Sequence, residues 1–219
     1  MDFAYISTIM PSILRGLVTT LALFFMTLGF ALPLGLVLTL GSISKFYPLK
    51  WLAKTYILVF RGTPLMLQLF FIYYGLPFMG ITLDQFPSAV LTFVLNYAAY
   101  FAEIYRAGIQ SIDIGQHEAA KTLGFTPAQT MQMIIIPQAI SRIIPPVCNE
   151  TVTLVKDTAL VTAIGVGEML KAAKGAVNRD MDISAYIVVA LIYLLLTLVM
   201  TKVYEKIEAH YNRYQKKGV

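Results

Sequence analysis

The sequence predicts an all-α membrane protein with about five transmembrane helices, an outer N-terminus and a cytoplasmic C-terminus. Of its 219 residues, 58% are hydrophobic and only 13% are charged, whereas an ordinary soluble domain carries about 25% charged residues. The apolar residues form long blocks without Asp, Glu, Lys or Arg. A bilayer core needs about 20 apolar residues per helix, and it offers free backbone groups no partner. These blocks are therefore predicted to be membrane-spanning helices.

The first predicted span covers residues 14–42, with residues 5–15 as an interfacial lead-in and a kink near Pro33. The second and third spans are predicted at residues 64–79 and 88–109. Basic residues in short loops mark the cytoplasmic side of a membrane. Four such residues follow the first span and place the loop before the second span in the cytoplasm: Lys45, Lys50, Lys54 and Arg61.

The next segment, about residues 110–132, is too polar to span a membrane, and its apolar positions predict two short helices at the membrane surface. The fourth span is predicted at residues 131–154, and the fifth at residues 183–202 continues as a charged helix. Residues 158–182 are predicted to form a re-entrant or outer-surface helical segment. Its basic residues disagree with an outer position, and they are Lys171, Lys174 and Arg179.

Several classes of function are excluded by what the sequence lacks. A single cysteine, Cys148, cannot form a disulfide framework within the chain. The chain has no G-x-x-x-x-G-K-[ST] loop for ATP, no Cys/His cluster for a metal, and no basic run with aromatic residues for nucleic acid. Its two histidines, His117 and His210, lie in polar segments. We therefore expect one membrane domain, residues 1–219, that is not an enzyme and needs no cofactor.

The polar segment after the third span carries the strongest motif. The tripeptide Glu-Ala-Ala at residues 118–120 predicts a helix with little side-chain bulk, which another protein's surface can approach closely. Gly124 predicts the end of that helix and a sharp turn, and Thr126 with Pro127 predicts the start of a second helix. This arrangement suits docking to a soluble partner, and an ordinary amphipathic interfacial helix is an equally good interpretation.

The whole motif resembles the signature of permease subunits of bacterial ABC importers. That signature is E-A-A, three residues, G, nine residues and I-x-[L/I]-P, and the matching residues here are Glu118, Ala119, Ala120, Gly124, Ile134 and Pro137. Ile136 stands where Leu is more usual. In that family the short helix of this loop inserts into a cleft on the ATPase subunit.

Three further stretches resemble the permeases for polar amino acids. They begin at Arg61-Gly62-Thr63-Pro64, at Asn96-Tyr97-Ala98-Ala99-Tyr100 and at Pro145-Pro146. The resemblance covers residues 16–204 and implies a type I ABC importer permease in the bacterial cytoplasmic (inner) membrane. It also implies a second permease subunit, with a homodimer favoured, separate ATPase subunits that hydrolyse ATP, and an extracytoplasmic amino acid-binding protein. Membrane lipid surrounds such a chain.

Two acids inside apolar spans are the first candidates for a substrate site. Glu103 and Glu150 are costly to bury in a membrane, which makes each a functional hypothesis by default. Two acids that face one water-filled cavity favour a cationic substrate such as arginine, lysine or histidine. Equally open are a structural pair of Glu103 with Arg106, a helix–helix hydrogen bond of Glu150, and glutamine or glutamate as substrate.

Other residues of the same spans are second-rank candidates for the pocket. They are Tyr100, Gln68, Met66, Asn149, Thr153 and Asp157. Lys156 and Asp157 are predicted to form a local charge pair that fixes a helix break. Two other classes of protein stay open. An ion-coupled secondary transporter requires inverted repeats, and a membrane enzyme requires a catalytic residue near one membrane face; neither feature stands out.

Overall fold

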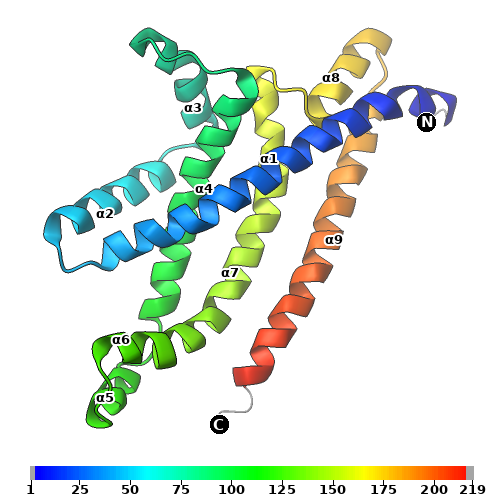
Figure 1. Cartoon of the computed structure of the whole chain (residues 1–219). Coiled ribbons are helices and arrows are strands. Elements are labelled where there is room, and N and C mark those ends of the chain that lie inside the picture. The colour runs from blue at the N-terminus through cyan, green and yellow to red at the C-terminus, as the bar shows by residue number, and fades with distance from the viewer. Residues whose placement is uncertain (1–2, 216–219) are drawn as a thin grey trace.

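The computed structural model describes residues 3–215, and all of the regular structure in that range is helical. Helix α1, Phe3–Ile43, runs obliquely across α4 and α7 (Figure 1). Residues 5–15, predicted as an interfacial lead-in, are the first part of this helix, which continues through Pro11. Ile9 and Ile13 are buried in a cluster that includes residues of α8 and α9.

The predicted second span is one arm of a broken helix pair. Residues 47–62 were predicted as a loop, but they form helix α2, Tyr47–Gly62. The chain then bends by 104° and continues as α3, Leu65–Phe70, and as irregular helix to Met79. Pro64 explains the bend, because a proline forces the preceding residue into an extended conformation, and Thr63 has φ −122° and ψ 146°.

Helix α4, Gln85–Gln110, contains the predicted third span and lies at the centre of the fold. It packs against α1, α2 and α7 (Figure 1). Three described helices are long and apolar enough to cross a membrane, or four if the bent pair counts as one. Because α4 faces protein on several sides, it keeps polar residues such as Asn96 and is not among those helices. The count of five spans stays a prediction.

The remaining elements follow the predicted order. They are α5 (Ile114–Thr122), α6 (Pro127–Thr130), a π-helical turn (Met131–Ile135), α7 (Ile136–Asp157), a 3₁₀ helix (Thr158–Ile164), α8 (Met169–Asp180) and α9 (Ser184–Gln215). The predicted fourth and fifth spans correspond to α7 and α9. Residues 158–182 are helical, as predicted, and α8 lies at the opposite end of the molecule from α5 and α6 (Figure 1).

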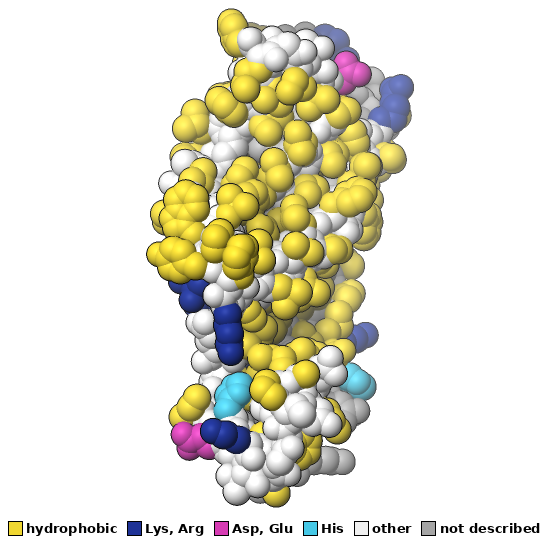
Figure 2. Space-filling model, turned by 60° about the vertical axis from the view of Figure 1, so that its left-hand side comes forward, with side chains coloured by type: hydrophobic (Ala, Val, Ile, Leu, Met, Phe, Trp, Pro, Cys, Tyr) yellow, Lys and Arg dark blue, Asp and Glu magenta, His cyan; other side chains and the backbone are white. Residues whose placement is uncertain are grey.

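The largest buried side chains lie on α4. Phe93, Tyr97 and Phe101 are each at most 1% exposed and pack with residues of α1 and α7. Gly35 lets α1 approach them, because a Cβ there would lie 2.9 Å from the Cβ of Phe101. The outside is different, since Figure 2 shows a broad hydrophobic surface over the middle of the molecule. Such a surface suits contact with lipid rather than with water.

Candidate functional site

Hydrogen bonds from two side-chain amides, those of Gln68 and Asn96, stabilise the break between α2 and α3. Gln68 donates hydrogen bonds to the carbonyl oxygens of Phe60 at 2.9 Å and Thr63 at 3.1 Å. Its own side-chain oxygen accepts from the Asn96 amide at 3.0 Å, and Asn96 also donates to Phe60 at 3.0 Å. Gln68 therefore holds the break to α4, and its amide is occupied by these bonds rather than free for a substrate.

This fastening directs Arg61, the penultimate residue of α2, onto α4. Its guanidinium carbon lies 5.4 Å from the centre of the Tyr100 ring, a cation–π distance. One of its nitrogens lies 3.7 Å from the Glu103 carboxylate. Arg106 donates to the same carboxylate at 2.8 Å. Glu103 is therefore paired with two arginines. The pair with Arg106 is the structural alternative that the sequence offered for Glu103, and the pair with Arg61 is additional.

Two cavities between the α2–α3 break, α4 and α7 share Arg61, Tyr100 and Glu150, and we call them together the polar groove. Their volumes are about 690 Å³ and about 450 Å³. The larger is lined by Arg61, Tyr100, Glu103, Ile104, Ala107, Gly108, Ser111, Arg142, Pro146, Asn149 and Glu150. The smaller is lined by Arg61, Gly62, Thr63, Pro64, Leu65, Asn96, Tyr97, Tyr100, Glu150, Thr153 and Asp157.

The acids of the groove differ in how they are paired. Glu150 lines both cavities, and within the described part of the chain it has no hydrogen bond or ion pair. Asp157 accepts a hydrogen bond from the Tyr97 hydroxyl at 2.8 Å. The helix break predicted there is confirmed, since α7 ends at Asp157. The charge of Lys156 acts on Asp157, as predicted for a local charge pair, but without a direct contact: the two form no ion pair among the described residues, and Lys156 is exposed. Among the described residues, Glu150 and Asp157 are therefore the two groove acids without an ion pair, and Glu150 also lacks a hydrogen bond.

The other predicted pocket residues divide between the groove and the surface. Tyr100, Asn149 and Thr153 line it. Met66 lines neither cavity and is 41% exposed on α3, because the bend at Pro64 turns that side of the helix outward. Sequence reasoning missed Arg142, whose guanidinium donates to the carbonyl oxygen of Ser111. The one signal for it was a basic residue inside a predicted span.

The α5–α6 turn has the local geometry that the motif predicted. Gly124 adopts a left-handed conformation with φ +83°, and the Phe125 amide donates to the Ala120 carbonyl at 3.0 Å, which closes the C-terminus of α5. Thr126 caps α6 in a capping box with Gln129. The helix end at Gly124 and the helix start at Thr126 are thus confirmed.

The small-residue surface of α5 is narrower than predicted. Glu118 and Ala119 are exposed, but Ala120 is only 1% exposed and faces its own chain. Pro137, near the start of α7, is exposed. Large apolar side chains that the sequence did not single out stand around this end of the molecule. They are Ile114, Leu123 and Met133, each at least 64% exposed. An exposed apolar end of this kind suits contact with another protein.

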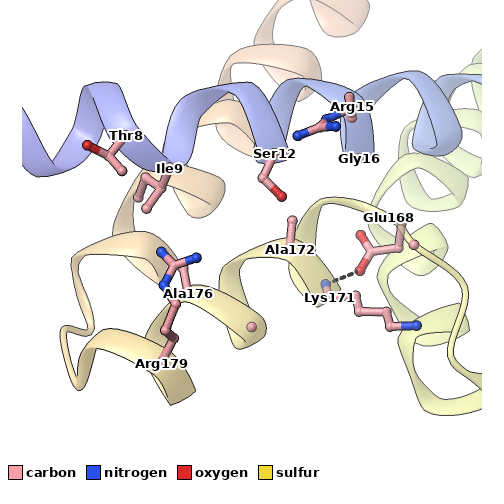
Figure 3. Close-up of a pocket in the computed structure, with 12 residues that line it drawn as sticks. Thr8, Ile9, Ser12, Arg15, Gly16, Glu168, Lys171, Ala172, Ala176 and Arg179 are labelled. Atoms are coloured by element: carbon pink, nitrogen blue, oxygen red, sulfur yellow. Dashed lines mark hydrogen bonds between the residues drawn. The ribbon is translucent and has the colours of Figure 1, made fainter.

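Another cavity, of about 460 Å³, lies between the first part of α1 and α8. Figure 3 shows Ser12 pointing from α1 toward α8, and the Arg179 side chain reaching from α8 toward α1. Arg179 is already paired with Asp180 at 2.6 Å, which holds the pKa of that exposed carboxyl below its usual value. Beside the cavity the two helices touch at Gly16, where a Cβ would lie 2.7 Å from backbone atoms of Glu168 and Met169.

Glu168 is a buried acid that fastens this end of the molecule. It is 1% exposed, and it accepts hydrogen bonds from the backbone amides of Leu170 at 2.8 Å and of Lys171 at 2.7 Å, the latter drawn in Figure 3. The Tyr193 hydroxyl of α9 also donates to it at 2.9 Å. The Lys171 ammonium donates to the Gly165 carbonyl. These groups cap helices and join α8 to α9, so we assign them a structural role.

Comparison with known proteins decides the family. The model of the family "Binding-protein-dependent transport system inner membrane component" matches residues 31–213. The chain belongs to this family. The permease is 43% identical over 211 residues to the arginine transport system permease protein ArtQ of Bacillus subtilis (strain 168), covering 95% of this chain and 96% of that protein. It is 40% identical over 206 residues to the L-cystine transport system permease protein TcyB of the same organism, covering 93% and 88%.

Solved structures agree with this membership. The permease matches a chain of the "Crystal structure of an amino acid ABC transporter with histidines" at a TM-score of 0.91 and 38% identity, covering 96% of this chain and 99% of that chain. A methionine ABC transporter, MetNI, shares the fold at a TM-score of 0.72 and 18% identity, with coverages of 96% and 99%. The chain is thus an amino acid ABC importer permease and a multi-pass protein of the cytoplasmic membrane. Membership decides against the ion-coupled secondary transporter.

Proposed function

We propose that this permease, paired with a second permease subunit, imports cationic amino acids such as arginine, lysine and histidine by alternating access. The observation that carries the proposal is the charge of the polar groove. Glu103 is compensated by Arg61 and Arg106, whereas Glu150 has no partner among the described residues. An unpaired carboxylate in a partly desolvated site favours a cation over a neutral side chain.

The rest of the groove fits the two charges that every amino acid carries. Arg61 is 40% exposed and stands at the junction of the two cavities, where it can receive a substrate carboxylate. Asp157 and Glu150 line the smaller cavity together and can receive ammonium groups. Tyr100, Asn149 and Thr153 supply neutral polar contacts. A zwitterionic amino acid has one ammonium group and can pair with only one of these two carboxylates. A substrate with a cationic side chain can pair with both.

Glutamine or glutamate is the second candidate substrate. One relative at 38% identity is named a probable glutamine ABC transporter permease protein, GlnM of Bacillus subtilis (strain 168). The charged side chains that line the larger cavity are Arg61, Arg142, Glu103 and Glu150. They sum to no net charge, and a neutral side chain fits there as well. The unpaired Glu150 is the reason for ranking cationic substrates first.

Two partners complete the proposed importer. A separate ATPase subunit hydrolyses ATP and docks on the α5 end, with Glu118, Ala119, Gly124 and the exposed apolar side chains around them as the contact. An extracytoplasmic amino acid-binding protein delivers substrate at the opposite end, where α8 lies (Figure 1). A ligand shifts such a transporter only through different affinities for its states, and α5 is the contact through which ATP can exert that effect.

Uptake into proteoliposomes tests the substrate. The permease is reconstituted with its ATPase and binding protein, and uptake of labelled arginine, lysine, histidine, glutamine and glutamate is compared with and without ATP. We expect ATP-dependent uptake of the cationic group. ATP-dependent uptake of glutamine or glutamate alone would keep the importer and refute the role of Glu150. Uptake that ignores ATP would refute the proposed docking of an ATPase at α5.

A further inference from the structure

Helix α2 carries a row of basic residues along one side, and two of them form no ion pair within the described part of the chain. Lys50, Lys54 and Arg61 are four and seven residues apart, a spacing that places them on one side of a helix. Within residues 3–215 neither Lys50 nor Lys54 takes part in an ion pair, whereas Arg61 is shared with Glu103. Lys45, just before the helix, is also unpaired in that range and exposed.

A cavity beside this row of charges is distinct from the polar groove. It has a volume of about 480 Å³, it lies between the end of α1, α2 and α4, and we call it the basic cavity. Its lining includes Ser42, Lys54, Leu58, Arg61, Glu103 and Arg106. Three cations surround one carboxylate there, and Glu103 already accepts from Arg106 at 2.8 Å. The cavity therefore has an excess of positive charge, and of its three cations Lys54 is the one that makes no hydrogen bond or ion pair among the described residues.

The surroundings of the basic cavity are apolar and aromatic. Leu58, which lines it, is 72% exposed. The tip of the α1–α2 hairpin exposes Tyr47 and Trp51 by 76% and 62%. Tyr and Trp gather where a bilayer meets water. Figure 2 shows basic side chains directly below the broad hydrophobic surface, on the side that leads to α5 and α6.

We propose that the basic cavity binds the phosphate group of an anionic phospholipid, with the acyl chains lying along the exposed apolar side of α2. A phosphate diester satisfies cations that the chain leaves unpaired, and the cations favour an anionic headgroup over a zwitterionic one. The exposed Leu58 in the lining, with Tyr47 and Trp51 on the same side of α2, argues for a lipid rather than for free phosphate, because a soluble ion gains nothing from apolar side chains.

The bound lipid has a consequence for the polar groove, which rests on the proposed function. Arg61 and Glu103 line both the basic cavity and the groove. A phosphate near Arg61 competes with Glu103 and with a substrate carboxylate for the same guanidinium. The lipid composition of the membrane therefore tunes the charge that the groove presents to its substrate.

Lipid binding is measured on the purified full-length chain in detergent, independently of transport. The chain is titrated with phosphatidylglycerol or with phosphatidylcholine, and bound lipid is counted by native mass spectrometry. We expect tighter binding of phosphatidylglycerol and an about fivefold loss of its affinity in Lys54→Gln, which is the effect of one basic residue near an anionic lipid. Lys54→Arg keeps the affinity. Lys45→Gln, the matched control outside the cavity, changes it by less than about twofold.

Three results overturn the proposal. One is equal affinity for the two lipids, and another is an equal loss in Lys45→Gln and Lys54→Gln, which indicates a diffuse surface charge without a site. The third is displacement of the lipid by inorganic phosphate at the same concentration, which indicates an ion site. None of these results depends on which amino acid is transported, so failure here and failure of the proposed function are distinguishable.

Discussion

Replacing Glu150 with Gln removes one negative charge from the polar groove while it keeps the size of the side chain. The residue lines both cavities and has no hydrogen bond or ion pair in the described part of the chain. The substitution therefore breaks no polar interaction within that part. A hydrogen bond to a charged group contributes about 1.5–3 kcal/mol. If the carboxylate holds a cationic side chain, the affinity of the groove for arginine falls about 10- to 150-fold.

The assay is ATP-driven uptake into proteoliposomes, with KM and the maximal rate measured for arginine and for glutamine. We expect a raised KM for arginine in Glu150→Gln and an effect below about threefold for glutamine, which has no side-chain charge to lose. Glu205→Gln changes an exposed acid of α9 outside both cavities and is the matched control. Equal losses for arginine and glutamine would refute the reasoning, and so would unchanged arginine uptake.

Three more outcomes follow from the structure. Ala119→Trp places a bulky side chain on the exposed side of α5, so uptake is lost while the spans stay folded and ATP hydrolysis continues; normal coupled uptake contradicts the docking role, and Ala119→Ser serves as its control. Gly16→Ala puts a Cβ 2.7 Å from the backbone of α8 and lowers the melting temperature by about 3–9 °C, whereas Gly175→Ala, with nothing within 4 Å, does not. Gln68→Leu removes one of the two acceptors of the Asn96 amide and the Gln68 donor to the Thr63 carbonyl, and it costs about 1–3 kcal/mol; a melting temperature equal to that of the unsubstituted permease would show that the break is held without the Gln68 amide.

The segments with strong local chemistry were predictable from the sequence. Gly124 requires a left-handed conformation at the end of α5, and Thr126 followed by proline specifies a helix start, so both appear where the sequence placed them. Long apolar blocks likewise predicted α7 and α9. Helix α2 was missed because its lysines were read as markers of a loop. Those charges project from a helix whose other side is buried at Ala53 and Ile57.

The charge balance of the groove was not predictable, because it depends on contacts between distant parts of the chain. The sequence offered Glu103 a pair with Arg106, which the structure has, but it gave no sign that Arg61 also reaches Glu103 and not Glu150. Arg61 distinguishes them, and it reaches Glu103 only because Gln68 and Asn96 fold the α2–α3 break onto α4. Met66 was assigned to the pocket because the rotation of α3 after Pro64 cannot be read from residue types.

Helix α1 has 41 residues, which corresponds to a length of about 60 Å. The hydrocarbon layer of a bilayer is only about 30 Å thick. Helix α1 runs obliquely across α4 and α7 (Figure 1). Membrane helices tilt by up to about 40°, which is too little to fit this length within the layer, so part of α1 lies outside the hydrocarbon. A slanted helix meets lipid tails of both leaflets along one flank, and its tilt changes with their length. Since α1 touches α8 at Gly16 and α4 at Gly35, acyl-chain length is a mechanical variable that any reconstitution of this permease has to hold constant.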